Sequence, residues 1–293
     1  MPVRAEDAAK ANITSETAAK SELKKQLKAI VADKNAQVGI AVIFDGHETV
    51  TLNNGRRYPM MSVYKFHQAL AVADYCQRKG ISFDTPVYIA KSDLKPDTYS
   101  PLRDKYPDGN IFVTIGELLE YTLHLSDNNA CDILFGMTGG PQATDAYIRN
   151  LGIRRFAIKA TEDEMHQDLR VCYTNWSTPL ETARLIEMLV TRRLFDKEYQ
   201  DFIIRAMVTS QTGLDRLSAP LTATNAVIGH KTGTGDRNDE GRLIGTNDAG
   251  FVRLPNGKRY TIAVFVKDSA ESAEATSKII ADISQAVFQY ACK

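Results

Sequence analysis

The sequence predicts an α/β fold of the α+β type: an antiparallel sheet flanked by N- and C-terminal helices, with an inserted all-α lobe. Three observations predict it. Strand patterns occur near the two ends of the chain, a long run of helical patterns separates them, and short hairpin turns join the strands. We therefore expect residues 1–56 and 209–293 to form one discontinuous α/β lobe, and residues 57–208 to form an all-α lobe.

The first predicted elements are a helix and a hairpin. Residues 14–33 carry apolar side chains on one stripe and charged ones opposite, which indicates an amphipathic helix. Residues 38–44 form a continuous apolar run, typical of a buried strand. Asp45-Gly46 is a strong turn signal, after which residues 49–52 return as the second strand.

Helical spacing of apolar residues dominates the middle of the chain. It predicts helices at 62–79, 114–124, 128–136, 141–150, 178–190 and 197–206. Thr114 precedes Glu117 by three residues, the spacing of a capping box, and supports a helix start there.

Strand character resumes after residue 208. Strands are predicted at 226–228, 242–254 and 260–266, with a hairpin turn at 254–258, and a final amphipathic helix at 270–291. Because the strands come from both ends of the chain, we expect them to pair in a single sheet.

Composition narrows the class of protein. The 36 basic and 36 acidic residues cancel, which argues against a nucleic acid or an anionic membrane as partner. No segment approaches the roughly 20 apolar residues that span a bilayer. The first residues lack the apolar core of an export signal, so either the protein is cytosolic or the chain begins after a removed signal.

The four cysteines show neither C-x-x-C nor zinc-like spacing. Cys76 and Cys131 fall in apolar, helix-like segments and are expected to be buried free thiols. We predict no metal, no cofactor and no obligatory disulfide.

Three short motifs carry the chemistry. In chain order they are Ser62-Val63-Tyr64-Lys65, Ser126-Asp127-Asn128 and Lys231-Thr232-Gly233. They supply a hydroxyl nucleophile, an amine one helical turn away, a second hydroxyl and a second cation, which suits attack on a strained or activated amide. S-x-x-K also occurs at Ser21 and Ser92, but in charged or loop-like surroundings that favour solvated surface.

Ser62 differs because it opens an apolar run that reads as a buried helix. Lys65 then lies on the same helical face, and a lysine pointing into a core is costly unless it serves a purpose. Because the two other motifs follow Ser62 in this order, an ordinary helix-capping serine is the weaker interpretation of Ser62.

These residues resemble a class A serine β-lactamase, and the resemblance covers nearly the whole chain. It is carried by the three motifs and by segments 99–101, 160–166, 230–234 and 264–272. The last two are most similar to the subgroup containing PER-, VEB- and CfxA-type extended-spectrum enzymes. The resemblance implies the serine β-lactamase and penicillin-binding-protein fold and an acyl-enzyme mechanism.

The resemblance also implies catalytic roles. Ser62 would open the lactam ring, with the backbone N–H groups of Ser62 and Thr234 as oxyanion hole. Lys65 would accept or relay the serine proton, and Ser126, held by Lys231, would protonate the lactam nitrogen. Glu162 would activate the water that releases the product, while the acylation base stays open between Glu162 and Lys65. By spacing alone, Glu162 reads as part of a solvated acidic loop.

Substrate contacts follow from the same resemblance. Residues Thr232, Gly233, Thr234 and Arg216 would form the pocket for the substrate carboxylate. Asn128 would bond the acylamino side chain, and Tyr99 would be an aromatic wall. His166 would help hold the hydrolytic water, unless it is a loop histidine without a function.

The chain departs from the family pattern in several places. Ala160 and Asn175 stand where many members pair Arg with Asp to close the loop carrying the glutamate. Together with His166 and two short insertions, this favours a roomier site able to accept bulky cephalosporins. Met61 stands where carbapenem-hydrolysing relatives commonly have Cys, so strong carbapenemase activity is not expected.

The expected protein is a periplasmic or secreted monomer that hydrolyses penicillins and cephalosporins and confers antibiotic resistance. Three alternatives stay open at this point. A penicillin-binding D-alanyl-D-alanine peptidase would share the motifs but lack a deacylating base. A non-catalytic β-lactam sensor would stay acylated, and a scaffold would leave Lys65 and Lys231 unexplained.

Overall fold

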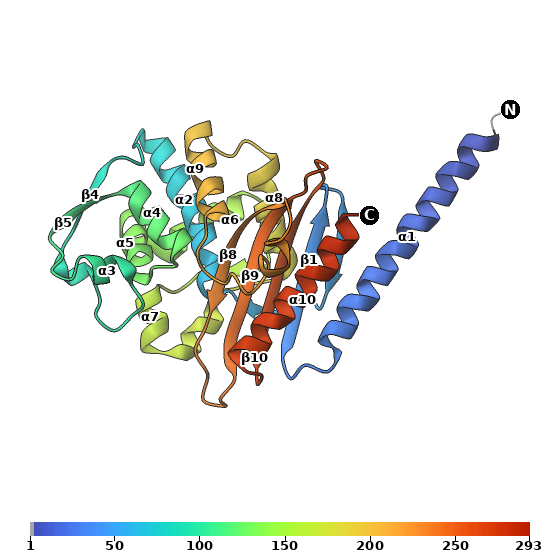
Figure 1. The fold of residues 1–293 in the computed structure, drawn as a ribbon. Coiled ribbons are helices and arrows are strands. Elements are labelled where there is room, and N and C mark those ends of the chain that lie inside the picture. Colours follow the sequence, from blue (N-terminus) through green and yellow to red (C-terminus); the bar gives the residue numbers. More distant parts are fainter. Residues whose placement is uncertain (1–2) are drawn as a thin grey trace.

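A computed structural model describes residues 3–293, with side chains from residue 18 onward. Its centre is a five-stranded sheet in the order β2-β1-β10-β9-β8 (Figure 1). The strands are β1 (Gln37–Phe44), β2 (Glu48–Leu52), β8 (Val227–Thr234), β9 (Leu243–Arg253) and β10 (Arg259–Ser269). Every neighbouring pair is antiparallel, which confirms the predicted sheet built from both ends of the chain.

The two terminal helices cover one face of this sheet. They are α1 (Val3–Ala32) and α10 (Ala273–Ala291), which lie side by side. Leu23 and Leu27 of α1 join the apolar side of α10 and alternate residues of the strands in one buried cluster. The helix predicted at 270–291 begins three residues later, because Ser272 caps it by accepting a hydrogen bond from the Ala275 N–H.

The remaining helices lie on the other side of the sheet (Figure 1). They are α2 (Tyr64–Lys79), α4 (Ile115–His124), α5 (Asn128–Thr138), α6 (Gly140–Asn150), α8 (Pro179–Thr191) and α9 (Lys197–Val208). Helix α8 packs on β1, β9 and β10, and a second apolar cluster fills the space between the sheet and these helices. The predicted capping box forms, since Thr114 and Glu117 bond each other's backbone N–H groups.

Besides the predicted helices, the structure has short strands between residues 57 and 208. Strands β3 (Tyr58–Pro59), β6 (Phe156–Ala157) and β7 (Trp176–Ser177) form one small sheet, and β4 (Pro86–Ile89) pairs with β5 (Ile111–Thr114). Strands of two to four residues are too short for a period-two pattern to stand out in the sequence. The division into two lobes stays a prediction.

Short helical segments complete the described chain. They are α3 (Pro101–Lys105), α7 (Glu162–Gln167) and the 3₁₀ segments η1 (Met61–Val63), η2 (Lys91–Asp93), η3 (Leu169–Thr174) and η4 (Ala219–Leu221). The acidic segment at 162–164 therefore begins a short helix and is not an open loop. None of the described helices is both long enough and apolar enough to cross a membrane.

The thiols expected to be buried and free are so: Cys76 and Cys131 lie in the core without a disulfide partner. Cys172 is also buried and unpaired, while Cys292 is exposed. Burial raises the pKa of the Cys76 thiol to about 11, as expected of an inert core cysteine.

Acid stability should depend on His67, which is buried in α2 against the rings of Phe66 and Phe156. Burial lowers its pKa from 6.5 to about 4. The unfolded chain therefore takes up a proton on His67 as the pH falls below 6.5, whereas the folded protein takes it up only near pH 4. The free energy of unfolding therefore decreases as the pH falls through that window. At pH 5 the loss amounts to about 2 kcal/mol.

We expect His67→Phe to remove most of this pH dependence. Urea unfolding at pH 7.5 and pH 5 measures it, with the wild-type protein as reference. Equal losses of stability in the two proteins on going to pH 5 would contradict the assignment.

Candidate active site

Ser62 lies in η1, directly before α2, and its side chain is partly exposed. The segment preceding it is tied to the sheet because Asn247 Nδ2 of β9 donates to the carbonyls of Pro59 (2.8 Å) and Met60 (3.0 Å). Met61 has a φ of +47°, in the left-handed region that side-chain-bearing residues avoid. Backbone strain of this kind, immediately before a nucleophile, is typical of functional sites.

Gly233 allows β8 to approach the backbone of Ser62. A Cβ atom at this position would lie 2.5 Å from the Met60 carbonyl oxygen and 3.1 Å from the Ser62 nitrogen. Only glycine fits that approach. Thr234 is the next residue of β8, and its backbone N–H as part of the oxyanion hole stays a prediction.

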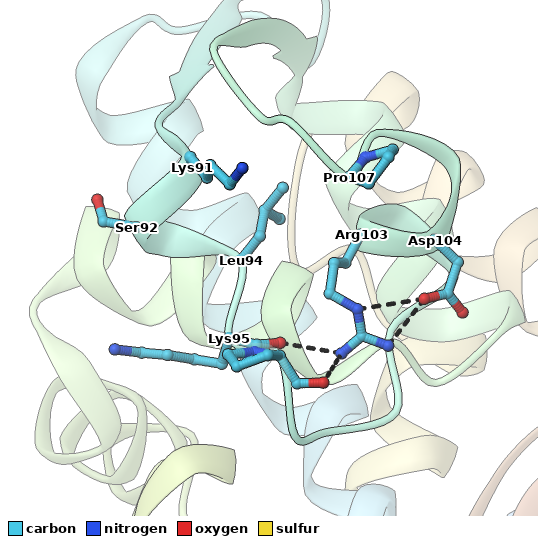
Figure 2. Close-up of a pocket in the computed structure, with 8 residues that line it drawn as sticks. Lys91, Ser92, Leu94, Lys95, Arg103, Asp104 and Pro107 are labelled. Carbon is cyan, nitrogen blue, oxygen red and sulfur yellow. Dashed lines mark hydrogen bonds and ion pairs between the residues drawn. The ribbon is translucent and has the colours of Figure 1, made fainter.

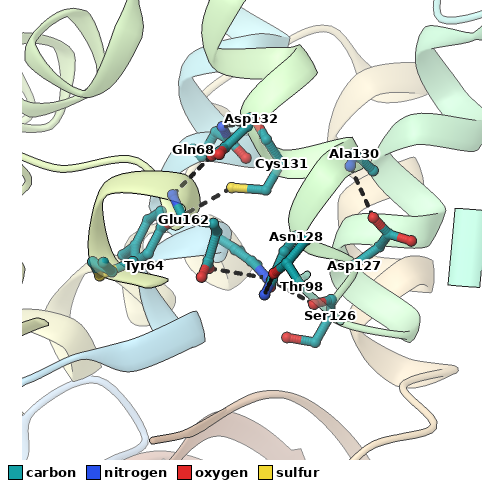
Figure 3. A network of polar contacts seen from close by, with 12 residues as sticks. Tyr64, Gln68, Thr98, Ser126, Asp127, Asn128, Ala130, Cys131, Asp132 and Glu162 are labelled. Atoms are coloured by element: carbon teal, nitrogen blue, oxygen red, sulfur yellow. Dashed lines mark hydrogen bonds and ion pairs between the residues drawn. The ribbon is translucent and has the colours of Figure 1, made fainter. Parts of the chain in front are cut away.

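Lys65 is completely buried, and its partners Ser126, Asn128 and Glu162 are labelled in the polar network of Figure 3. Its Nζ donates to the Ser126 carbonyl oxygen (2.6 Å) and to Asn128 Oδ1 (2.6 Å). Glu162 Oε1 lies 3.1 Å from the same Nζ as an ion pair without hydrogen-bond alignment. The amine therefore contacts groups from two other elements that are distant in sequence.

Glu162 is the first residue of α7, and its side chain is 11% exposed. The start of this helix is held by Asp132, whose Oδ1 and Oδ2 accept the N–H groups of Glu162 (2.8 Å) and Asp163 (2.9 Å). Thr161 and Glu164 complete the N-terminus as a capping box. Burial, followed by the nearby Glu162 charge, raises the pKa of Asp132 to about 7.

The segment carrying Glu162 is closed by amide hydrogen bonds. Asn175 Oδ1 accepts the N–H groups of Lys159 (2.7 Å) and Ala160 (3.0 Å), and its Nδ2 donates to the Ala160 carbonyl (2.9 Å). Ala160 and Asn175 thus lie side by side, as expected for positions that would otherwise carry an ion pair. A buried neutral clamp avoids the desolvation cost of a buried charge pair.

Ser126 and Lys231 meet where the sheet contacts the helices. Lys231 Nζ donates to Ser126 Oγ (3.0 Å) and to the Thr232 carbonyl (2.9 Å). Burial and the charge of Lys65 lower the pKa of Lys231 well below its ordinary value. Ser126 lies between α4 and α5, as predicted, and has a φ of +62°.

Arg216 reaches the end of β8 from the segment after α9 and is buried. Its guanidinium donates to Thr234 Oγ1 (2.7 Å) and to the carbonyls of Gly233 (3.1 Å) and Asn247 (2.9 Å). Thr232, buried two residues before Thr234, has its hydroxyl 2.6 Å from that of Thr212. Hydroxyls beside a guanidinium form a site suited to an anionic group.

Both ends of the Asn128 side-chain amide are hydrogen-bonded, since Oδ1 accepts from Lys65 and Nδ2 donates to Thr98 Oγ1 (2.8 Å). The segment containing Thr98 is clamped by Arg103, which donates to the carbonyls of residues 95, 96 and 98. Figure 2 shows the contact between Arg103 and Lys95. Tyr99 follows and is 58% exposed, with its carbonyl oxygen accepting the Asn128 N–H. Its backbone therefore lies beside the motif, while its role as an aromatic wall stays a prediction.

His166 is the predicted site residue that the structure does not bring into the network. It lies on α7 and is exposed, and no hydrogen bond or ion pair joins it to another residue of the described chain. Its predicted contact with the hydrolytic water stays a prediction.

Four further residues support the site: Asp132, Asn175, Thr98 and Asn247. Their supporting contacts were not predicted from the sequence, although Asn175 was noted there as a departure from the family pattern. Asp132 could have been found, because it follows Asn128 by four residues and so lies one helical turn along the same face. The other three lie in irregular segments or on a strand where no periodic pattern points to a partner. Among the described residues, no cluster of His, Cys, Asp and Glu could hold a metal ion.

A serine hydroxyl at a helix start, two buried amines, a second hydroxyl and a carboxylate together define a serine hydrolase that acts by acyl transfer. Comparison with known proteins identifies the family. The model of the β-lactamase enzyme family matches residues 22–291. The chain belongs to this family, and within it to the class A serine β-lactamases.

Individual relatives agree. A β-lactamase of Bacteroides uniformis is 44% identical, over 92% of this chain and 90% of that protein. β-Lactamase VEB-1 of Pseudomonas aeruginosa is 37% identical, over 90% of this chain and 89% of that protein. The crystal structure of TLA-1 extended-spectrum β-lactamase superimposes with a TM-score of 0.91 at 43% identity, covering 94% of this chain and 99% of that one. The predicted family and fold are confirmed.

Proposed function

We propose that this enzyme hydrolyses penicillins and cephalosporins through an ester formed on Ser62, in a site between an α/β lobe (1–56 and 209–293) and a helical lobe (57–208). The observation that carries the proposal is the position of Lys65. Its amine contacts Glu162, Asn128 and the Ser126 carbonyl at 3.1 Å or less, so one buried amine joins the groups needed for both half-reactions.

In acylation, Ser62 Oγ attacks the lactam carbonyl carbon while its proton passes to Lys65 or, through water, to Glu162. The negative charge that develops on the carbonyl oxygen is bound by the N–H groups of Ser62 and Thr234. The carbon–nitrogen bond then breaks, and Ser126 gives its proton to the ring nitrogen. Ser126 regains a proton from Lys65, which thereby passes on the proton taken from Ser62. Lys231, 3.0 Å from Ser126 Oγ, favours that transfer and attracts the substrate carboxylate.

In deacylation, Glu162 takes a proton from a water molecule that attacks the ester carbonyl. The ester bond to Ser62 Oγ breaks, and the proton returns to the serine. Asp132 supports this step because it holds the start of α7, where Glu162 lies. The product leaves with the ring opened.

The substrate is bound by groups on either side of Ser62. Thr232, Thr234 and Arg216, with Gly233 between the threonines, form the carboxylate pocket. Asn128 bonds the acylamino group, Tyr99 lines the entrance, and His166 borders the water. The neutral Asn175 clamp and the extended-spectrum name of TLA-1 support a site that accepts bulky oxyimino-cephalosporins. We further propose that the enzyme acts as a monomer in the periplasm or after secretion.

Ring opening of a chromogenic cephalosporin, followed by its absorbance, tests the proposal directly. We expect continuous turnover by the wild-type protein and none by Ser62→Ala, which should also fail to be labelled by penicillin. Labelling followed by release over hours would instead indicate a penicillin-binding peptidase or a sensor. Negligible turnover of an oxyimino-cephalosporin beside benzylpenicillin would contradict the extended spectrum.

A further inference from the structure

A buried carboxylate, Asp248, lies behind the proposed carboxylate pocket. It belongs to β9 and stands opposite Thr232 of β8, so its side chain and those of Thr232 and His230 share one face of the sheet. The side chains of Asp248 and His230 are 0% and 3% exposed. A fully buried carboxylate is costly and needs partners.

The partners of Asp248 connect three segments. His230 Nδ1 lies 2.9 Å and 3.0 Å from the two carboxylate oxygens, and Oδ2 also accepts the N–H of Leu217 at 3.1 Å. Leu217 directly follows Arg216. A single side chain of β9 thus joins β8 to the segment from which Arg216 enters the pocket.

Asp248 is also a counter-charge for the pocket. Arg216 gives its hydrogen bonds to carbonyl and hydroxyl oxygens, and no carboxylate of the described chain forms an ion pair with it. Burial lowers the pKa of Arg216, and the charge of Asp248 opposes this more than that of Asp215 does. Lys231 is faced by the charges of Lys65 and Arg216, which lower its pKa, and by those of Glu162 and Asp248, which raise it.

We propose that Asp248 is a positioning residue for binding of the substrate carboxylate. Through His230 and the Leu217 backbone it fixes the segment that carries Arg216, and it supplies buried negative charge behind Arg216 and Lys231. This inference rests on the proposed hydrolysis of β-lactams.

The test compares one cephalosporin as its free acid and as its carboxylate ester. The wild-type enzyme should prefer the free acid, and Asp248→Ala should reduce that preference about tenfold or more, chiefly through KM for the acid. A general loss of structure would lower hydrolysis of both forms alike. Asp215→Asn is the matched control, because Asp215 is exposed and also faces Arg216; it should keep the preference.

Asp248→Asn removes the charge of residue 248 and nearly preserves its shape, so the effect of the charge can be measured by itself. The amide can still accept the Leu217 N–H, but it no longer stabilises protonated Lys231. The pKa of Lys231 should therefore fall, and the alkaline limb of the kcat/KM profile should move to lower pH. Thermal unfolding checks that each variant is folded.

The outcomes distinguish a failure of the proposed function from a failure of the role of Asp248. A wild-type protein that hydrolyses neither form overturns the proposed function, and one that hydrolyses both equally overturns the carboxylate pocket and this inference with it. A wild-type preference that folded Asp248→Ala retains, whether both rates are unchanged or fall alike, overturns the role of Asp248 alone. If Asp248→Ala does not fold, an unmoved alkaline limb in Asp248→Asn overturns it.

Discussion

Glu162→Gln should convert the enzyme into a protein that accepts a penicillin and fails to release it. The amide is nearly isosteric with the carboxylate but cannot take a proton from water, so deacylation should fall about 10³-fold. Intact mass spectrometry should show a lasting adduct on the variant. A chromogenic cephalosporin should give a burst close to one product per enzyme, followed by slow turnover.

Asp163→Asn is the control for that experiment. Asp163 is the next residue of the same helix, and its side chain bonds Gln167 instead of Lys65. Its substitution should leave turnover close to wild type. Rapid steady turnover by Glu162→Gln would refute the assignment of the water-activating base, whereas a normal labelling rate would identify Lys65 as the acylation base.

Asp132→Ala should slow deacylation about 10²-fold, since misplacement of a catalytic group by about 1 Å is enough for such a loss. The substitution removes both acceptors for the N–H groups that begin α7, and buried donors without partners shift to find new ones. Acylation should suffer less, because Ser62 stands on η1 and Lys65 on α2. Labelling rate and steady turnover, measured on one preparation, give the two effects separately.

Asp132→Asn adds a dependence on pH to the same prediction. The Asn amide offers one acceptor oxygen at every pH, while Asp132 offers two only when ionised, and its pKa is raised to about 7. The wild type should therefore deacylate faster than Asp132→Asn at pH 8, and the two should converge below pH 6. A ratio that stays constant across this range would contradict the anchoring role.

Much of the fold could be read from local patterns. The terminal strands, their Asp45-Gly46 turn and the long helices have periodic or turn signals that depend only on neighbouring residues. The two small sheets and α7 had no such signal, because each strand or helix there is six residues or shorter. Their formation depends on pairing partners brought in by the rest of the chain.

The residues of the active site likewise divide into those that the sequence made recognisable and those that it did not. Its reactive groups, Ser62, Lys65, Ser126 and Lys231, were recognisable because their chemistry requires those residue types in motifs of three or four residues. Apart from Asp132, the supports of these groups were not recognisable, since hydrogen bonds such as that from Asn247 to Pro59 cross 188 positions and leave no local pattern.

The sequence by itself determined the inventory of reactive groups, their order along the chain and the layered class of the fold. Only the tertiary structure decided that Asp132 would hold the helix of Glu162, that Asn175 would replace an ion pair, and that Asp248 would stand behind Arg216. The physical reason is that a buried polar group must find its partner in space, and spatial neighbours are set by packing rather than by position in the chain.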